Sequence, residues 1–192
     1  MPLSRVQPDQ YDNLLAAKVR AVSSLFADFD VPPVDAFASA PTGFRMRAEF
    51  RVWHDGAALD YVMFRPEDRR TPVPVTDFPI ACDSIRQLMP VLITAIRGNS
   101  ELRRKLFQVE FLSTLSGEAL VTLVYHRRLE ADWEQAAEGL RKSLSELSPE
   151  LSIIGRSRKQ KLLLGRDYVT ETLAINGRDY HYNQYEQAFT QP

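Results

Sequence analysis

The stretch RMRAEFRVWHDG, from Arg45 to Gly56, alternates two kinds of side chain along one run. One register holds Arg45, Arg47, Glu49, Arg51 and Trp53, and the other holds Met46, Ala48, Phe50 and Val52. Successive side chains of a β-strand point to opposite faces, so this alternation predicts a strand with one face on a core. The other face then presents guanidinium groups beside an aromatic ring, which suit phosphates and bases. From this stretch alone, a solvated face in which Glu49 pairs with neighbouring arginines is equally open.

The segments around this strand indicate further hairpins. His54-Asp55-Gly56 predicts a turn into a strand at 59–64, while Ser116-Gly117 and Asn176-Gly177 predict two more tight turns. We expect the other strands at 107–115, 119–126, 151–154, 161–164, 168–175 and 178–182. The proline-rich stretch 66–79 allows at most a short edge strand at 73–75.

Apolar residues at helical spacing predict helices over 9–28, from Asp83 to Gly98, and over 131–147. The order of elements is helix, hairpin, helix, hairpin, helix, strands. This order indicates an α+β fold, a mostly antiparallel sheet with about three helices packed on it, and one sheet face can stay open for a ligand.

Composition excludes several classes of protein. The chain has 192 residues, 44% hydrophobic residues and a formal net charge of -1, so it can form a real core and is not uniformly basic. Its single cysteine, Cys82, rules out an internal disulfide and is more typical of a buried structural residue than of a nucleophile. No signal peptide or membrane-length apolar run is present, so we expect a cytoplasmic protein without membrane contact.

Motifs for catalysis are scarce. His54, His126 and His181 lie in unrelated segments without the short spacings of a zinc site, so no metal is expected. The eight glycines form neither a G-x-G-x-x-G pattern nor a phosphate-binding loop. Motifs alone therefore indicate no catalytic constellation in this chain.

Basic and aromatic residues occur together at predicted strand ends. Arg103, Arg104 and Lys105 precede Phe107; Tyr125 and His126 precede Arg127 and Arg128; and Arg156, Arg158, Lys159 and Lys161 fill a turn. Positive charge holds a phosphate backbone, and aromatic faces stack on unpaired bases, so the pattern favours RNA over duplex DNA. Ordinary polar turns of a charge-balanced domain are the open alternative.

Several runs resemble one family in order along essentially the whole chain. The runs QYDNLLAAKV, FRMRAEFRVWHDG, LRRKLFQVEFLSTLS, VYHRRLEADW, IGRSRKQK and AFTQP are similar to the amino-terminal half of bacterial tRNA (uracil-5-)-methyltransferase. The resemblance implies methylation of C5 of the T-loop uridine in tRNA, with S-adenosyl-L-methionine as methyl donor. It also implies a Rossmann-like catalytic domain beyond Pro192, which is absent from this chain. The motifs that carry the nucleophilic cysteine and the general-base glutamate are absent with it.

The resemblance also assigns roles to single residues. Arg51, Phe107 and His126 match positions at the family's RNA surface, and Arg47 shares the face of Arg51. Phe189 and Gln191 match the FTQ segment, Phe189 as an RNA contact and Gln191 beside the methyl donor.

On this basis, residues 1–180 form an RNA-recognition domain, and 181–192 form a linker and the start of the missing catalytic domain. The expected partner is the T arm of tRNA, the expected oligomeric state is a monomer, and the chain alone should be inactive. Two alternatives are the amino-terminal part of an rRNA uridine C5-methyltransferase and a stand-alone interaction module without catalysis.

Overall fold

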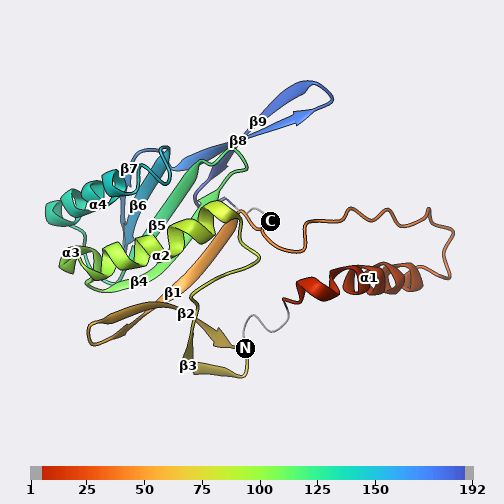
Figure 1. Ribbon diagram of the computed structural model, residues 1–192, viewed down its shortest axis with the longest axis horizontal. Coiled ribbons are helices and arrows are strands. Elements are labelled where there is room, and N and C mark those ends of the chain that lie inside the picture. Colours follow the sequence, from red (N-terminus) through yellow and green to blue (C-terminus); the bar gives the residue numbers. More distant parts are fainter. Residues whose placement is uncertain (1–5, 189–192) are drawn as a thin grey trace.

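A seven-stranded sheet forms the centre of the protein, seen here in a computed structural model that describes residues 6–188 (Figure 1). Its strand order is β3-β2-β1-β4-β5-β6-β7. The strands are β1 (Arg47–Asp55), β2 (Ala58–Arg65), β3 (Asp68–Pro74), β4 (Leu106–Ser113), β5 (Ala119–Tyr125), β6 (Leu151–Ser157) and β7 (Gln160–Leu164). Only the β5–β6 pair is parallel among these neighbours, so the sheet is mostly antiparallel as predicted.

Strand β1 has the predicted two-faced character. Ala48, Phe50 and Val52 are buried in the core, whereas Arg51 and Trp53 of the other register are exposed. The Phe50 ring packs edge-on against Phe78 with ring centroids 5.2 Å apart, so the apolar register anchors the strand.

One face of the sheet carries the helices and the main core. Helix α2 (Asp83–Arg97) and helix α4 (Ala131–Ser143) lie along the sheet, and the short α3 (Ser100–Arg103) joins α2 to β4 (Figure 1). Helix α2 buries Ile85, Leu88, Met89, Leu92, Ile93 and Ile96, and α4 buries Trp133, Ala137 and Leu140. The predicted helices from Asp83 and from residue 131 are therefore confirmed, although α4 ends at Ser143.

The opposite face is divided between a covered end and an open end. A small cluster of Leu112, Leu120, Ile154 and Val169 covers one end, with Val169 supplied by strand β8 (Tyr168–Ile175). Strand β8 pairs with β9 (Arg178–Tyr185), and this hairpin projects from the body (Figure 1). Asn176 and Gly177 both have positive φ at its turn, as the Asn-Gly signal predicted. Arg51 lies toward the open end.

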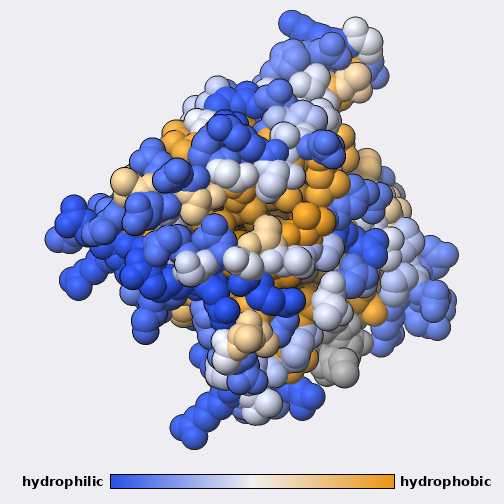
Figure 2. Space-filling model, turned by 60° about the vertical axis from the view of Figure 1, so that its left-hand side comes forward, coloured by the Kyte–Doolittle hydropathy of each residue, from blue (hydrophilic) through white to orange (hydrophobic). Residues whose placement is uncertain are grey.

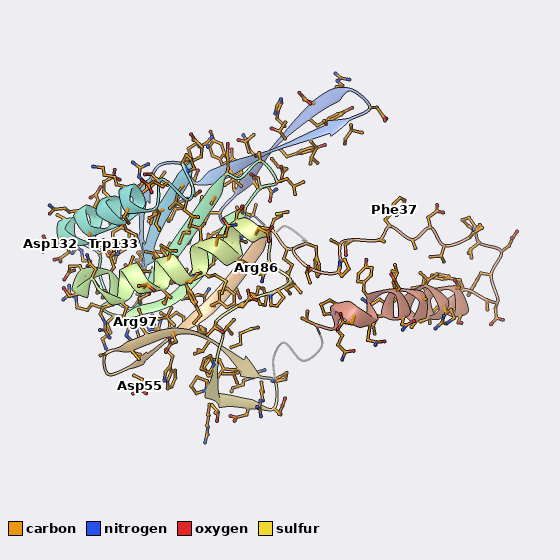
Figure 3. The ribbon with its side chains drawn as sticks, in the orientation of Figure 1. Phe37, Asp55, Arg86, Arg97, Asp132 and Trp133 are labelled. Carbon is orange, nitrogen blue, oxygen red and sulfur yellow. The ribbon has the colours of Figure 1, made fainter. Side chains whose placement is uncertain are left out.

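The first helix differs from the expectation of a packed element. A short 3-10 helix, η1 (Pro8–Gln10), leads into α1 (Tyr11–Leu25), and neither buries a residue. Helix α1 and the extended segment after it stand apart from the body, and Phe37 on that segment is 93% exposed (Figures 1 and 3). The apolar stripe was read correctly as a helix, but periodicity alone does not say what a stripe packs against.

Two further elements extend beyond their predicted bounds. Strand β3 spans Asp68–Pro74 instead of 73–75, and it remains an edge strand, where Pro74 is tolerated. Strand β9 continues to Tyr185, beyond its expected end at 182, so residues 181–185 of the expected linker lie inside a paired strand. Within residues 6–188, no helix is long and apolar enough to cross a membrane.

Candidate nucleic-acid interface

A β-bulge at the start of β4 turns Phe107 toward Arg51 and His126. Leu106 pairs with Tyr125 and Gln108 pairs with Val124, so Phe107 is the extra residue between them. The Arg51 guanidinium carbon lies 3.7 Å from the centroid of the Phe107 ring. The Phe107 and His126 rings stack with centroids 4.0 Å apart and an interplanar angle of 27°. Three residues from three strands or strand ends therefore form one continuous stack.

Backbone contacts hold this stack in place. The His126 amide donates to the Lys105 carbonyl at 3.0 Å, and His54 Nε2 lies 2.7 Å from the Leu106 carbonyl. Lys105 has φ of 58°, a left-handed conformation that is uncommon for residues other than glycine. A cavity of about 460 Å³ lies beside the stack, lined by Lys105, Phe107 and His126 among others.

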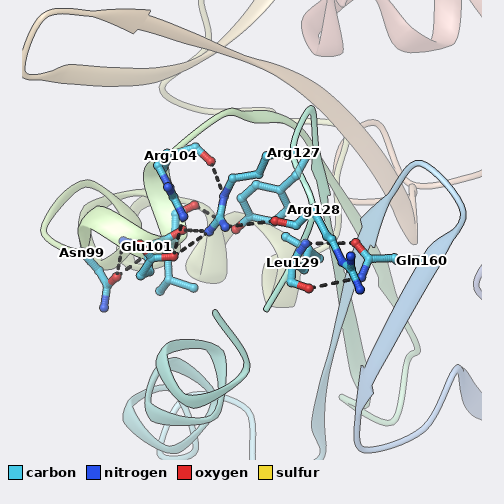
Figure 4. A network of polar contacts seen from close by, with 9 residues as sticks. Asn99, Glu101, Arg104, Arg127, Arg128, Leu129 and Gln160 are labelled. Atoms are coloured by element: carbon cyan, nitrogen blue, oxygen red, sulfur yellow. Dashed lines mark hydrogen bonds and ion pairs between the residues drawn. The ribbon is translucent and has the colours of Figure 1, made fainter. Parts of the chain in front are cut away.

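Arg127 ties the loop after β5 to the loop before β4 (Figure 4). Its Nη2 atom donates to the Glu101 backbone carbonyl at 2.6 Å and lies 3.0 Å from the Glu101 carboxylate. Its Nε atom donates to the Arg104 carbonyl at 2.9 Å. Arg127 is therefore a positioning residue whose charge is already compensated, and it fixes the loops that carry Lys105 and His126.

Gln160 ties the same loop to the turn between β6 and β7 (Figure 4). Its side-chain oxygen accepts from the Leu129 amide at 3.0 Å, and its side-chain nitrogen donates to the Leu129 carbonyl at 3.1 Å. A cavity of about 800 Å³ lies between the two segments, lined by His126, Arg127 and Arg128 on one side and by residues 156–160 on the other. The basic groups thus surround a concave site with fixed walls.

Arg47 has a different environment from Arg51, although both lie on the same face of β1. Its guanidinium donates to the carbonyls of Glu186 at 2.8 Å and Tyr185 at 3.3 Å. The Glu186 carboxylate is buried and forms a two-pronged ion pair with Arg156. Burial raises the pKa of Glu186, but the hydrogen bond and charge of Arg156 outweigh it, so the net pKa lies below the usual range.

The structure thus brings together three of the residues proposed from sequence, Arg51, Phe107 and His126. Arg47 is separated from Arg51 by about 13 Å along the strand and holds the segment 186–188. Phe189 and Gln191 lie outside the described residues. No group of three or more His, Cys, Asp or Glu side chains within residues 6–188 is arranged to hold a metal ion.

Sequence reasoning missed Arg127, Gln160 and Glu186 as organising residues. Their long-range contacts join segments separated by 23 to 139 positions, and no local pattern marks such pairs.

The space-filling view shows how hydrophilic side chains cover most of one side and the projecting hairpin, with hydrophobic atoms visible between them (Figure 2).

Comparison with known proteins identifies the family. The family model described as tRNA (Uracil-5-)-methyltransferase matches residues 10–192. The chain belongs to the tRNA (uracil-5-)-methyltransferase family. This agrees with the resemblance on the runs around Arg51, Phe107 and His126.

Curated relatives of this methyltransferase family are similar over the whole chain. The tRNA/tmRNA (uracil-C(5))-methyltransferase of Vibrio parahaemolyticus is 50% identical over 97% of this chain and 50% of its own length. The enzyme of the same name from an Azoarcus species is 49% identical over 100% of this chain and 51% of its own length. The chain thus spans about half the length of these methyltransferases.

A solved structure has the same fold. The Pyrococcus abyssi tRNA (uracil-54, C5)-methyltransferase, in complex with S-adenosyl-L-homocysteine, superposes with a TM-score of 0.60 at 15% sequence identity. The match covers 94% of this chain and 44% of that one. At this identity the likeness establishes the architecture, and the α+β arrangement is that of a uracil-C5 methyltransferase of known structure.

Proposed function

We propose that this chain is the tRNA-binding part of an S-adenosyl-L-methionine-dependent tRNA (uracil-5-)-methyltransferase and that its open sheet end binds the T arm. The observation that supports this best is the stack of Arg51, Phe107 and His126. Its outer members are exposed, and cationic side chains surround it. Such a surface can stack unpaired bases and hold phosphates at once.

The stack has the chemistry that an enzyme acting on a looped-out base requires. Extruding a uridine costs a few kcal/mol, roughly, because neighbouring bases lose stacking partners. The outer face of His126 is a flat surface that replaces such a partner, each stacked base contributing about 1–3 kcal/mol, and Phe107 supports it from the inner side. Arg51 adds a guanidinium plane that can stack on a base or pair with a phosphate.

Methyl transfer itself is assigned to the region that the relatives have beyond the matched half. Within this proposal, S-adenosyl-L-methionine is the methyl donor and Gln191 lies next to its site, as the FTQ resemblance implies. The residues of this chain contribute by binding and orienting the RNA, so the T arm should bind without the donor.

The test is RNA binding by single variants of the chain. Phe107→Ala should weaken binding of a T-arm stem-loop about tenfold or more, consistent with the loss of ~1–3 kcal/mol of stacking. Arg51→Ala should also make the negative slope of log affinity against log salt shallower by about 1. Affinity is measured by fluorescence anisotropy across a salt series, and circular dichroism confirms folding.

Arg141→Ala is the matched control, because Arg141 lies on α4 and pairs with Glu138 away from the stack. It should leave affinity and salt slope unchanged. If Phe107→Ala and Arg141→Ala bound the stem-loop equally well, the stack would not be the RNA site and the proposal would be wrong.

A further inference from the structure

We propose that Arg128 and the turn between β6 and β7 form a second RNA subsite, which holds the sugar-phosphate backbone of a base-paired stem. This inference rests on the proposed function, because it places the stem next to loop bases held at the stack of Arg51, Phe107 and His126. The site is the cavity of about 800 Å³ between the segment 124–128 and the segment 156–160. Neither the family resemblance nor the likeness to relatives assigns a role to this turn.

Its cations are available for a ligand. Within the described part of the chain, the side chains of Arg128, Arg158 and Lys159 form no hydrogen bond or ion pair. The neighbouring Arg127 and Arg156 are instead compensated by Glu101 and Glu186. Three uncompensated positive charges around one concavity repel each other and are relieved by an anion.

The backbone of the turn indicates that a lysine side chain is useful there. Lys159 has φ of 64°, a conformation that costs a residue with a Cβ atom about 1 kcal/mol or more and that glycine adopts freely. Lys105, beside the stack, has the same conformation. Apart from Asn176 in its Asn-Gly turn, these lysines are the only non-glycine residues with positive φ in the stretch 6–188.

The two walls of the site are fixed relative to each other. Gln160 bonds both backbone groups of Leu129, and the Ser157 hydroxyl donates to the Gln160 side-chain oxygen at 2.8 Å. These bonds join the β6–β7 turn to the loop that carries His126 and Arg128. A fixed spacing favours a ligand whose phosphates are themselves rigidly spaced, as in a helical stem.

The turn itself offers no ring, and this separates it from the stack, whose exposed His126 lines the opposite wall of the cavity. Among its described lining residues outside the stack, the only aromatic is Tyr125, which is 2% exposed and donates its hydroxyl hydrogen bond to the Leu102 carbonyl. Bases therefore have no platform at the turn, whereas guanidinium, ammonium and hydroxyl groups suit phosphate oxygens. The stack is suited to loop bases and the turn to the backbone.

The separation of the two sites fits one RNA hairpin. β4 and β6 flank β5 in the sheet, so Phe107 and Arg156 are roughly two strand spacings, about 10 Å, apart, and the turn lies about 7–10 Å further along β6. The separation of Phe107 and the turn is therefore about 12–14 Å. A nucleic-acid strand advances about 3.4 Å per nucleotide, so the turn meets phosphates about four nucleotides from the stacked base. In a hairpin, that position lies where the loop enters its stem.

The experiment compares two hairpins that share the T loop, one with a full stem and one with the stem shortened to its closing base pairs. The double variant Arg158→Ala/Lys159→Gly should bind the full-stem hairpin about tenfold more weakly. Its negative slope of log affinity against log salt should be shallower by roughly 2. It should bind the short-stem hairpin like the unmodified chain. Lys159→Gly also relieves the backbone strain, so thermal unfolding should show no loss of folding.

Two controls separate the possible outcomes. Lys142→Ala on α4 removes an exposed lysine elsewhere and should leave the affinity for both hairpins unchanged. Phe107→Ala should lower the affinity for both hairpins to the same extent. Two results would overturn the subsite, provided that Phe107→Ala still weakened binding. In the first, the turn variant binds the full-stem hairpin with normal affinity. In the second, it binds both hairpins with equally reduced affinity. If Phe107→Ala also had no effect, the proposed function itself would fail.

Discussion

Gly155 shows how one small residue sets the position of the basic turn. It lies in β6 immediately before Arg156, and a Cβ atom built on it would overlap the ring of Trp133, which is fully buried. Because the end of the indole ring occupies the space where a Cβ atom would lie, α4 and β6 approach more closely than any larger residue would allow. The segment 156–160 is therefore placed by a packing contact on the helix side of the sheet.

Gly155→Ala should consequently lower the free energy of unfolding by about 1–3 kcal/mol, the usual cost of adding volume to a well-packed core. Urea denaturation measures this change. Gly139→Ala is the matched control, because Gly139 is exposed within α4 and a Cβ atom there meets nothing within 4 Å. That variant should be more stable by roughly 0.5–1 kcal/mol. Equal stability of the two variants would contradict the packing argument.

At the scale of elements, α1 is structurally independent of the sheet. It buries no residue, and its clearest tertiary contact is the hydrogen bond between the Tyr11 hydroxyl and Ser39 Oγ at 3.2 Å, within the same arm. The first described backbone bonds from this region to the body come from Gly43 and Arg45, which donate to Pro79 and Ile80.

A chain that begins at Pro41 should therefore unfold at nearly the same urea concentration as the full chain, with a difference below about 1 kcal/mol, because little apolar area is lost from the core. Far-ultraviolet circular dichroism should show less helix while the cooperative transition remains. A loss above about 2 kcal/mol would mean that the arm packs on the body in solution. Removing α2 instead would expose six buried residues and abolish folding.

The elements that sequence predicted well are those specified by local chemistry. Alternation at Ala48, Phe50 and Val52 predicted β1, and Asn176-Gly177 predicted the β8–β9 hairpin, because strand period and turn conformation depend on neighbouring residues alone. The stripe of α1 was not distinguishable from that of α2, since burial depends on what packs against a helix. The length of β3 likewise depends on its pairing with β2.

The candidate site was predictable in part for the same reason. Sequence pointed to Arg51, Phe107 and His126, but their stacking depends on the β4 bulge, which only strand pairing creates. Arg47 was assigned to the RNA surface from its register, and the register is right. Its contacts with carbonyls of Tyr185 and Glu186, 138 and 139 positions away, could not be read from the strand.

Over the whole molecule, a net charge of -1 conceals a separation of charge. Uncompensated cations gather at the end of the sheet where β5 and β6 finish, whereas at the other end Glu118 pairs with Arg166 and Glu171 accepts from the Leu115 amide. Attraction of an RNA is therefore directed to the first end, which orients the encounter without a large total charge. Segment 186–188 crosses the same face, beside Arg47 and Arg156.

The attachment of that segment depends on the charge of Glu186. Its folded-state pKa lies below the usual value of about 4.3 because Arg156, Thr122 and Lys161 outweigh the effect of burial. A lowered carboxyl pKa stabilises the fold at neutral pH, and this contribution disappears as pH falls through the folded pKa. The unfolding free energy of the chain should therefore decline toward that of Glu186→Gln as pH is lowered from 7 to below about 4.

Glu110→Gln is the control with the opposite sign. Burial raises the pKa of Glu110 more than the hydrogen bond from Gln108 lowers it, so the charged form of Glu110 destabilises the fold. The unfolding free energy of the chain should therefore rise relative to that of Glu110→Gln as pH falls. Urea unfolding across the same pH series measures both differences. If the Glu186→Gln difference stayed constant with pH while the Glu110→Gln difference changed, the carboxylate of Glu186 would not hold the segment through its charge, and the carbonyl contacts of Arg47 would suffice.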